Sequence, residues 1–185
     1  MKRNAVGFLL ALSMIARADA FRIDSDQQVA AIMSGARRDV VLMIPDLRSV
    51  EVYNALKTVL VSDRLKVRVL TNASTVMNGA NRIAALSLLG LEIKNPPSDL
   101  KQTAQAYDVQ VRVLSGIKER FALVDGQQLM RGPVVGEPPT IGQARTWLIT
   151  EPGDVERFRT HFNSNWARAK PWVYRIPRSV IRRQK

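Results

Sequence analysis

Hydrophobic residues in the first half of the chain switch repeatedly between the spacing of a helix and the spacing of a strand. From Ser25 to Arg37 they recur every three or four residues behind the capping-box sequence Ser25-Asp26-Gln27-Gln28, which predicts a helix. An unbroken apolar run, VVLMIP, follows at 40–45 and is typical of a buried strand. The pattern then repeats, and it predicts helices from 49 to about 60 and over 80–89, and strands over 66–70 and 91–94. This β-α-β-α-β order predicts an α/β fold, in which a sheet carries helices on its faces.

The second half of the chain is richer in strands and loops. After the break at Asn95-Pro96-Pro97-Ser98, the pattern predicts a loop or weak helix and then a strand over 110–114. The stretch IKERFALVDGQQLMRG, Ile117 to Gly132, reads as a hairpin around an Asp125-Gly126 turn. A Gly- and Pro-rich loop, a strand over 146–150 and a final helix from Pro152 complete the prediction. That helix carries an apolar stripe made of Val155, Phe158, Phe162 and Trp166.

The first twenty residues have the pattern of a secretory signal peptide. Lys2 and Arg3 precede a short apolar core from Ala5 to Ala16, and Ala18-Asp19-Ala20 offers a small-residue cleavage site before Phe21. An uncleaved N-terminal anchor is the alternative. Cleavage predicts an exported, bacterial periplasmic protein, and its formal charge would fall from +12 to about +10.

Composition narrows the chemistry further. The chain has 185 residues, of which 46% are hydrophobic and 24% charged, which predicts one domain of moderate size over 21–169. The surplus of 28 Lys and Arg over 16 Asp and Glu favours polyanionic partners such as nucleic acid. With no cysteine and one histidine, His161, the sequence excludes disulfides, thiol nucleophiles and cysteine metal sites, and we expect neither a cofactor nor a metal.

The C-terminal segment, 170–185, is basic and contains no acid. Aromatic residues alternate there with cations, so the segment could hold a phosphate backbone by charge and a base by stacking. A solvated or locally packed tail, or a tail that docks on lipid or protein, is equally compatible with this composition. The candidate binding residues are Lys170, Trp172, Tyr174, Arg175, Arg178, Arg182 and Arg183.

Three stretches, IPDLRSVEVYNALKTVL, LKVRVLTN and LSLLGLEIK, resemble the phospholipase D-like superfamily, and VERFRTHFNSNW resembles the last helix of its domains. The similarity runs from Ser25 to Trp166, and in size the chain resembles the small, single-domain Nuc-type bacterial endonucleases. The resemblance implies a phospholipase D-like mixed β-sheet flanked by helices on both faces, in a single domain. It also implies a homodimer, because small members pair two chains so that each supplies one motif to a shared site.

The family's catalytic motif is His, any residue, Lys, four residues, Asp, six residues, Gly-Ser, two residues, Asn. Aligned on Asp125 and Gly132, which match, the chain keeps the spacing. It departs from the motif at four positions, with Lys118 for the histidine, Arg120 for the lysine, Pro133 for the serine and Gly136 for the asparagine. The motif is therefore predicted to be degenerate.

The replacements bear directly on the chemistry that the resemblance implies. In the family, the histidine attacks phosphorus, and the lysine, serine and asparagine bind the phosphoryl oxygens. Lys118 is a poor nucleophile because an ammonium group with a pKa of about 10.4 stays protonated. Arg120 could hold a phosphate with its two-pronged guanidinium, so Lys118 and Arg120 are the candidate anion-binding residues. His161 is the one histidine that could substitute for the missing nucleophile, although an ordinary helix-surface histidine is the simpler interpretation.

The sequence is compatible with three functions. The leading hypothesis is an exported, catalytically inactive phospholipase D-like protein that binds phosphate groups, nucleic acid or a partner protein. Because family relatives in bacteria accompany plasmid-transfer genes, the resemblance extends this to an accessory of conjugation with partners in the secretion or conjugation machinery. The second hypothesis is an active endonuclease or phospholipase with a rearranged site built from Lys118, Arg120, Asp125 and His161. The third is a purely structural assembly component.

Overall fold

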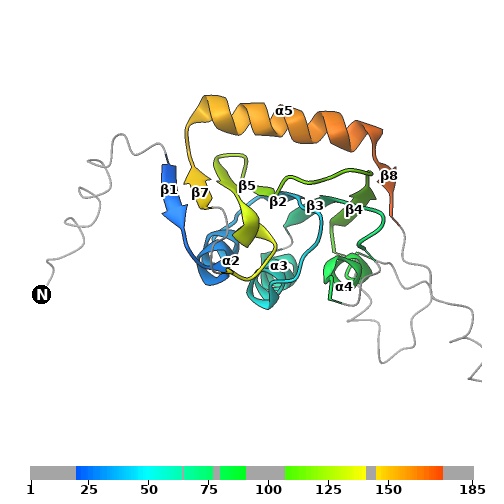
Figure 1. The fold of residues 1–185 in the computed structure, drawn as a ribbon. Coiled ribbons are helices and arrows are strands. Elements are labelled where there is room, and N and C mark those ends of the chain that lie inside the picture. Colours follow the sequence, from blue (N-terminus) through cyan, green and yellow to red (C-terminus); the bar gives the residue numbers. More distant parts are fainter. Residues whose placement is uncertain (1–19, 64, 77–79, 91–106, 141–144, 173–185) are drawn as a thin grey trace, which may run out of the picture.

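The computed structural model describes residues 20–63, 65–76, 80–90, 107–140 and 145–172. One eight-stranded mixed sheet runs through the described part of the chain, in the order β1-β7-β6-β5-β2-β3-β4-β8 (Figure 1). Its strands are β1 (Ala20–Ile23), β2 (Asp39–Met43), β3 (Lys66–Thr71), β4 (Val109–Val113), β5 (Phe121–Val124), β6 (Gln128–Arg131), β7 (Thr146–Ile149) and β8 (Lys170–Pro171). The parallel strands β2, β3 and β4 lie together, and the remaining pairs are antiparallel. The predicted α/β class with a mixed sheet is confirmed.

Helices cover both faces of this sheet, as predicted. On one face lie α2 (Asp26–Ser34), α3 (Val50–Asp63) and α4 (Ile83–Leu88), and on the other lies α5 (Pro152–Arg168) (Figure 1). The short 3-10 helix η2 (Pro133–Val135) follows β6. None of the described helices is long and apolar enough to cross a membrane.

The alternation of side chains along the strands divides the interior into two cores. The larger core contains Val40, Leu42, Val67 and Val69 from the sheet and lies under α2, α3 and α4. The smaller core contains the residues at the intervening positions, including Val41 and Leu70, and lies under α5. The apolar stripe of α5 packs on it, with Val155, Phe158 and Phe162 buried and Trp166 half-buried.

The first helix begins at the predicted capping box but ends earlier than predicted. The capping box is formed: Gln28 N–H donates to Ser25 Oγ at 3.2 Å, and Ser25 N–H donates to Gln28 Oε1 at 3.2 Å. The helix ends at Ser34, three residues before the predicted end, because the backbone N–H groups of Arg37 and Arg38 donate to Asp125 instead.

Some predicted elements lie outside the described residues, and others differ from their predicted bounds. The predicted strand over 91–94, most of the predicted loop or weak helix before 107, and the signal segment up to residue 19 lie outside the described residues. The helix predicted over 80–89 is shorter, Ile83–Leu88. Two strands that were not predicted, β1 and β8, form the two edges of the sheet.

Candidate functional site

The hairpin that carries the motif spacing is built around a tight turn. Asp125 and Gly126 both have positive φ, 54° and 65°, and Gln127 N–H donates to the carbonyl of Val124 at 3.0 Å. Positive φ at both central positions suits the twist of a two-stranded hairpin, and the Asp-Gly pair adopts it readily. The predicted hairpin and its turn are confirmed.

Asp125 uses its carboxylate to hold the main chain. It accepts hydrogen bonds from the backbone N–H groups of Arg37 at 2.9 Å, Arg38 at 2.8 Å and Asp39 at 3.2 Å. Burial raises the pKa of Asp125, but the hydrogen bonds from Arg38, Arg37 and Asp39 outweigh it and lower the pKa below its ordinary 3.8. The carboxylate thus fastens the β5–β6 turn to the segment that enters β2.

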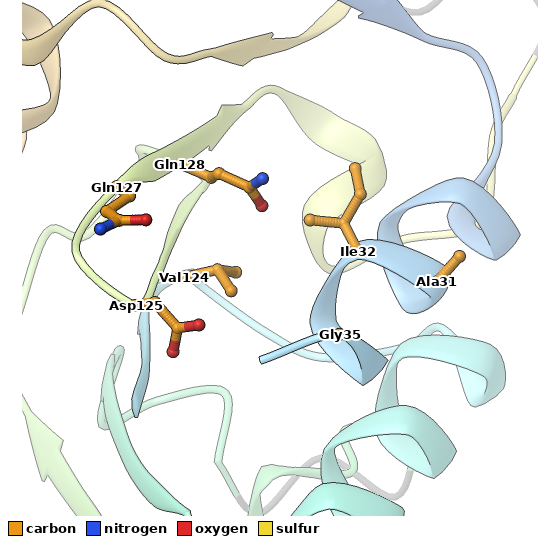
Figure 2. Close-up of a pocket in the computed structure, with 7 residues that line it drawn as sticks. All are labelled: Ala31, Ile32, Gly35, Val124, Asp125, Gln127 and Gln128. Atoms are coloured by element: carbon orange, nitrogen blue, oxygen red, sulfur yellow. The ribbon is translucent and has the colours of Figure 1, made fainter. Parts of the chain in front are cut away.

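Beside this turn lies a pocket of about 270 Å³ between the hairpin and α2 (Figure 2). It is lined by Ala31, Ile32, Gly35, Val124, Asp125, Gln127 and Gln128. Asp125 is its one ionisable lining residue, and both carboxylate oxygens already accept backbone hydrogen bonds. The pocket therefore offers amide groups and apolar surface rather than a free charged group.

The cations ahead of β5 lie at the opposite end of that strand from Asp125. Lys118 and Glu119 are exposed, whereas Arg120 is partly buried, with 15% of its side chain exposed. Strand β5 separates Arg120 from Asp125. The structure consequently does not bring the four residues of the rearranged-site hypothesis together in one place.

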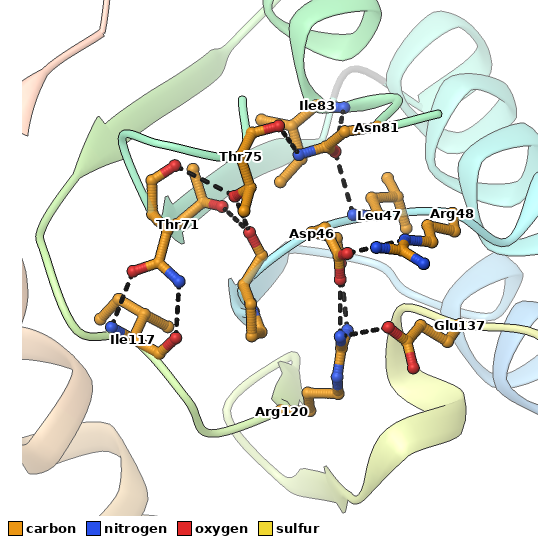
Figure 3. Close-up of polar contacts among 12 residues, drawn as sticks. Asp46, Leu47, Arg48, Thr71, Thr75, Asn81, Ile83, Ile117, Arg120 and Glu137 are labelled. Carbon is orange, nitrogen blue, oxygen red and sulfur yellow. Dashed lines mark hydrogen bonds and ion pairs between the residues drawn. The ribbon is translucent and has the colours of Figure 1, made fainter. Parts of the chain in front are cut away.

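The guanidinium of Arg120 pairs with two carboxylates (Figure 3). Its Nη2 lies 2.6 Å from Asp46 Oδ1 and 2.5 Å from Glu137 Oε1, and its Nη1 donates to the carbonyl of Asp46 at 3.2 Å. Asp46 also pairs with Arg48 Nε at 2.8 Å. We call Arg120, Asp46, Glu137 and Arg48 the arginine–carboxylate cluster. It has two cations and two carboxylates, so its formal charge is zero.

Other polar contacts fix the loops that surround the cluster. Thr71 and Thr75 hydroxyls donate to the carbonyl of Pro45 at 2.8 and 2.5 Å, directly before Asp46. The Asn72 side chain makes two hydrogen bonds with the backbone of Ile117, at 2.7 and 2.8 Å. These contacts hold the segments after β2 and β3 against the loop that bears Arg120, as Figure 3 shows.

The main chain at Gly136 packs against the arginine–carboxylate cluster. The Gly136 carbonyl accepts hydrogen bonds from the backbone N–H groups of Arg48 at 2.7 Å and Ser49 at 3.1 Å. A Cβ at this position would lie 2.6 Å from the Asp46 carbonyl oxygen and 3.0 Å from Arg120 Nη1. Two motif positions, 120 and 136, therefore meet at the cluster, and no side chain fits at the second.

The backbone conformation at position 132 requires a glycine. Its φ is 141°, and a Cβ there would lie 2.5 Å from Thr146 Cα in the neighbouring strand β7. This explains a glycine at that position without reference to chemistry.

His161 has a different partner from Arg120. It projects from α5 and pairs with Glu119, with 3.2 Å between Nε2 and Oε2. Arg120, the next residue in the loop, reaches in another direction, to Asp46. His161 and Arg120 are thus directed to separate partners. Among the described residues there is also no group of histidines and carboxylates that could hold a metal ion.

The candidate residues of the basic C-terminal segment divide into two groups. Lys170 belongs to β8, and Trp172 donates its backbone N–H to the carbonyl of Val111 at 2.9 Å and packs, half-buried, against the larger core. These residues continue the sheet beyond the predicted boundary at 169. Tyr174, Arg175, Arg178, Arg182 and Arg183 lie outside the described residues.

Comparison with known proteins identifies the fold. No protein-family model and no curated protein matches the sequence. Among solved structures, NucT from Helicobacter pylori is similar over 83% of this chain and 97% of its own, with a TM-score of 0.63 and 13% identity. Nuc from Salmonella typhimurium, a phospholipase D family member, is similar over 80% of this chain and 90% of its own, with a TM-score of 0.57 and 12% identity. The chain has the phospholipase D-like fold.

A third similar structure belongs to a protein of another description. TrmBL2, an archaeal chromatin protein with a novel mode of DNA binding, is similar over 89% of this chain and 59% of its own, with a TM-score of 0.53 and 12% identity. The phospholipase D-like fold of this chain was predicted from the resemblance of four sequence stretches to that superfamily, and the structural similarity confirms it.

Proposed function

We propose that this protein is a catalytically inactive, exported phospholipase D-like protein that binds polyanions, nucleic acid foremost. One observation carries the loss of catalysis: the guanidinium at the motif lysine position lies between Asp46 and Glu137, with the backbone of Gly136 packed against it. A substrate phosphate would have to displace two carboxylates there, at a cluster with no net charge. The motif histidine, which attacks phosphorus in the family, is replaced by Lys118, whose side chain has no imidazole, so the nucleophile is also missing.

Polyanion binding is supported by charge outside that cluster. The formal charge of +12 is large for 185 residues, and many of the described cations are exposed, Lys118 among them. Arg120, predicted as an anion clamp, is proposed instead to hold the site closed. The similarity to a DNA-binding chromatin protein is compatible with this use of the fold. Export rests on the first twenty residues, and the role in DNA transfer and the homodimer rest on the family resemblance.

The test combines a phosphodiesterase assay with a binding assay on the same full-length preparation. We expect no cleavage of bis(4-nitrophenyl) phosphate, plasmid DNA or phosphatidylcholine, and salt-dependent binding of DNA by mobility shift. Cleavage that disappears in both Lys118→Ala and His161→Ala would contradict the loss of catalysis. Absence of binding to DNA and to heparin at 50 mM salt would contradict the polyanion role and favour a purely structural component.

A further inference from the structure

A tryptophan on the α5 face of the sheet takes part in neither core. Trp147 lies in β7, and its neighbour Ile149 on the same face packs against the smaller core. The indole of Trp147 is half-buried, yet it belongs to neither of the two core clusters. Among the described residues, no aromatic pair and no cation–π contact involves it. A large aromatic side chain that stabilises no core is available for another purpose.

Arginines lie on both sides of this indole in one row across the sheet. The β1–β7 register places Arg22 directly opposite Trp147, and the β6–β7 register places Arg131 directly opposite it from the other side. Residues directly opposite in antiparallel strands share a face, with Cβ atoms about 5 Å apart. The row therefore has the order arginine, tryptophan, arginine. Arg145, also exposed, comes two residues before Trp147 at the same end of β7.

The charges around this row leave a positive surplus. Arg22 pairs with Asp24, but both side chains are more than half exposed, and such a pair contributes little and is readily exchanged. No ion pair involves Arg131 or Arg145 among the described residues. The guanidinium of Arg131 lies 5.2 Å from the ring centre of Phe158, and Arg157, which lies over the same ring, is balanced by Asp154. Three arginines thus face one exposed aspartate.

The geometry points to a binding surface for single-stranded nucleic acid, formed by Arg22, Arg131, Arg145 and Trp147, which we call the Trp147 patch. An indole between two arginines provides a face on which an unpaired base can stack, while the guanidinium groups reach the phosphates on either side. A duplex hides its base faces, and heparin or lipid headgroups have none, so only an unpaired strand uses both parts of the patch. This inference rests on the proposed polyanion binding and specifies where and what the protein binds.

The patch also lies near the motif region without being part of it. Arg131 pairs across strands with Phe121, the residue that follows Arg120, and so belongs to the same end of the sheet. Arg120 itself is engaged by Asp46 and Glu137. Binding at the Trp147 patch therefore requires no change in the arginine–carboxylate cluster.

The test is fluorescence anisotropy with a labelled twelve-nucleotide oligo(dT), the matching duplex and labelled heparin, using the full chain. Trp147→Ala should weaken binding of oligo(dT) by about 5- to 150-fold, the range for losing one base stack, and leave heparin affinity unchanged. Trp147→Phe should retain most of the affinity, and it also serves if the alanine variant fails to fold. Arg131→Gln should weaken the binding of both oligo(dT) and heparin. For oligo(dT), the slope of the logarithm of the binding constant against the logarithm of the salt concentration should become shallower by about 0.7.

Lys57→Gln is the matched control, because it removes the same charge from an exposed position on α3, on the other face of the sheet. If oligo(dT) binds and neither Trp147 variant nor Arg131→Gln differs from Lys57→Gln, the Trp147 patch is wrong while polyanion binding stands. If the wild-type chain binds neither oligo(dT) nor heparin, the proposed function itself fails.

Discussion

Replacing Arg120 with methionine tests whether this residue closes the site or serves as a ligand-binding cation. The substitution keeps much of the side-chain volume and removes the charge and the donors. It leaves Glu137 without its partner and Asp46 with Arg48 alone. If Arg120 holds the cluster together, the variant should lose stability. If Arg120 is a free anion clamp, the variant should lose polyanion binding instead.

The expected loss of stability follows from burial. Removing one partner from a buried ion pair costs about 3–5 kcal/mol, because an unpaired charge is left in a poorly solvated place. Asp46 is 7% exposed and Glu137 is 22% exposed, so Glu137 can regain part of its hydration. Asp46 also retains Arg48 at 2.8 Å. We therefore expect Arg120→Met to lower the free energy of unfolding by about 2–4 kcal/mol.

Urea unfolding followed by circular dichroism measures this quantity directly. The urea concentration at the midpoint of unfolding should fall. The slope of free energy against urea should stay unchanged, because unfolding exposes the same amount of surface. Arg48→Met is the matched control: Arg48 contacts the same carboxylate, but 51% of its side chain is exposed, so about 0–1 kcal/mol is expected. A stability for Arg120→Met within 0.5 kcal/mol of the wild type, together with weaker DNA binding, would refute the reasoning.

Two further substitutions test positions that share motif spacing with Arg120. Gly136→Ala should destabilise the protein by about 1–3 kcal/mol in thermal or urea unfolding, because its Cβ would lie 2.6 Å from the Asp46 carbonyl oxygen. An unchanged stability would contradict the tight packing of this segment. Asp125→Asn should destabilise the protein at neutral pH, because the lowered pKa of Asp125 means that its carboxylate stabilises the fold above the ordinary 3.8 and that this contribution disappears as the pH falls through the lowered value. The difference in urea midpoint between wild type and Asp125→Asn should therefore be largest above pH 3.8 and shrink as the pH falls from there toward pH 2. A difference independent of pH would contradict a role for the charge.

Elements with a strong local signal could be predicted from the sequence. The capping box at Ser25, the apolar run of β2 and the Asp125-Gly126 turn each depend on residues close together in the chain. The α5 stripe is similar, since Phe158 and Phe162 recur at helical spacing. In all four, the local preference and the tertiary packing favour the same structure.

The edge strands could not be predicted in this way. β8 has two residues, one of them a proline, and exists because it pairs with β4, more than fifty residues earlier in the chain. β1 overlaps the predicted cleavage site at Ala20 and is defined by its pairing with β7. Neither segment has an alternating pattern long enough to indicate a strand, so only the three-dimensional arrangement identifies them.

The acidic partners of Arg120 could not be predicted from the sequence either. Asp46 precedes Arg120 by 74 residues, and Glu137 lies within a Gly- and Pro-rich stretch predicted as loop. The motif alignment drew attention to Lys118 and Arg120 as free cations, because it describes which residues replace the family's own and not which acids approach them. A carboxylate directly after a buried strand, as Asp46 is, was the one available signal.

The local structure explains the residues found at positions 120, 125, 132 and 136 of the motif alignment. Gly132 is required by a φ of 141° and by the approach of β7, and Asp125 fastens the turn to three backbone N–H groups. Both are needed by the fold whatever the chemistry. Positions 120 and 136, in contrast, fit one another: the guanidinium of Arg120 is larger than the ammonium group of the family's lysine, and Gly136 has no side chain to obstruct it. An asparagine at 136 would collide with Asp46 and Arg120, so placing the family's residue at either position alone should not create a phosphate site. In the proposed inactive protein, Arg120 and Gly136 together leave no room for a phosphate, because the guanidinium is held by Asp46 and Glu137 and the main chain packs against it.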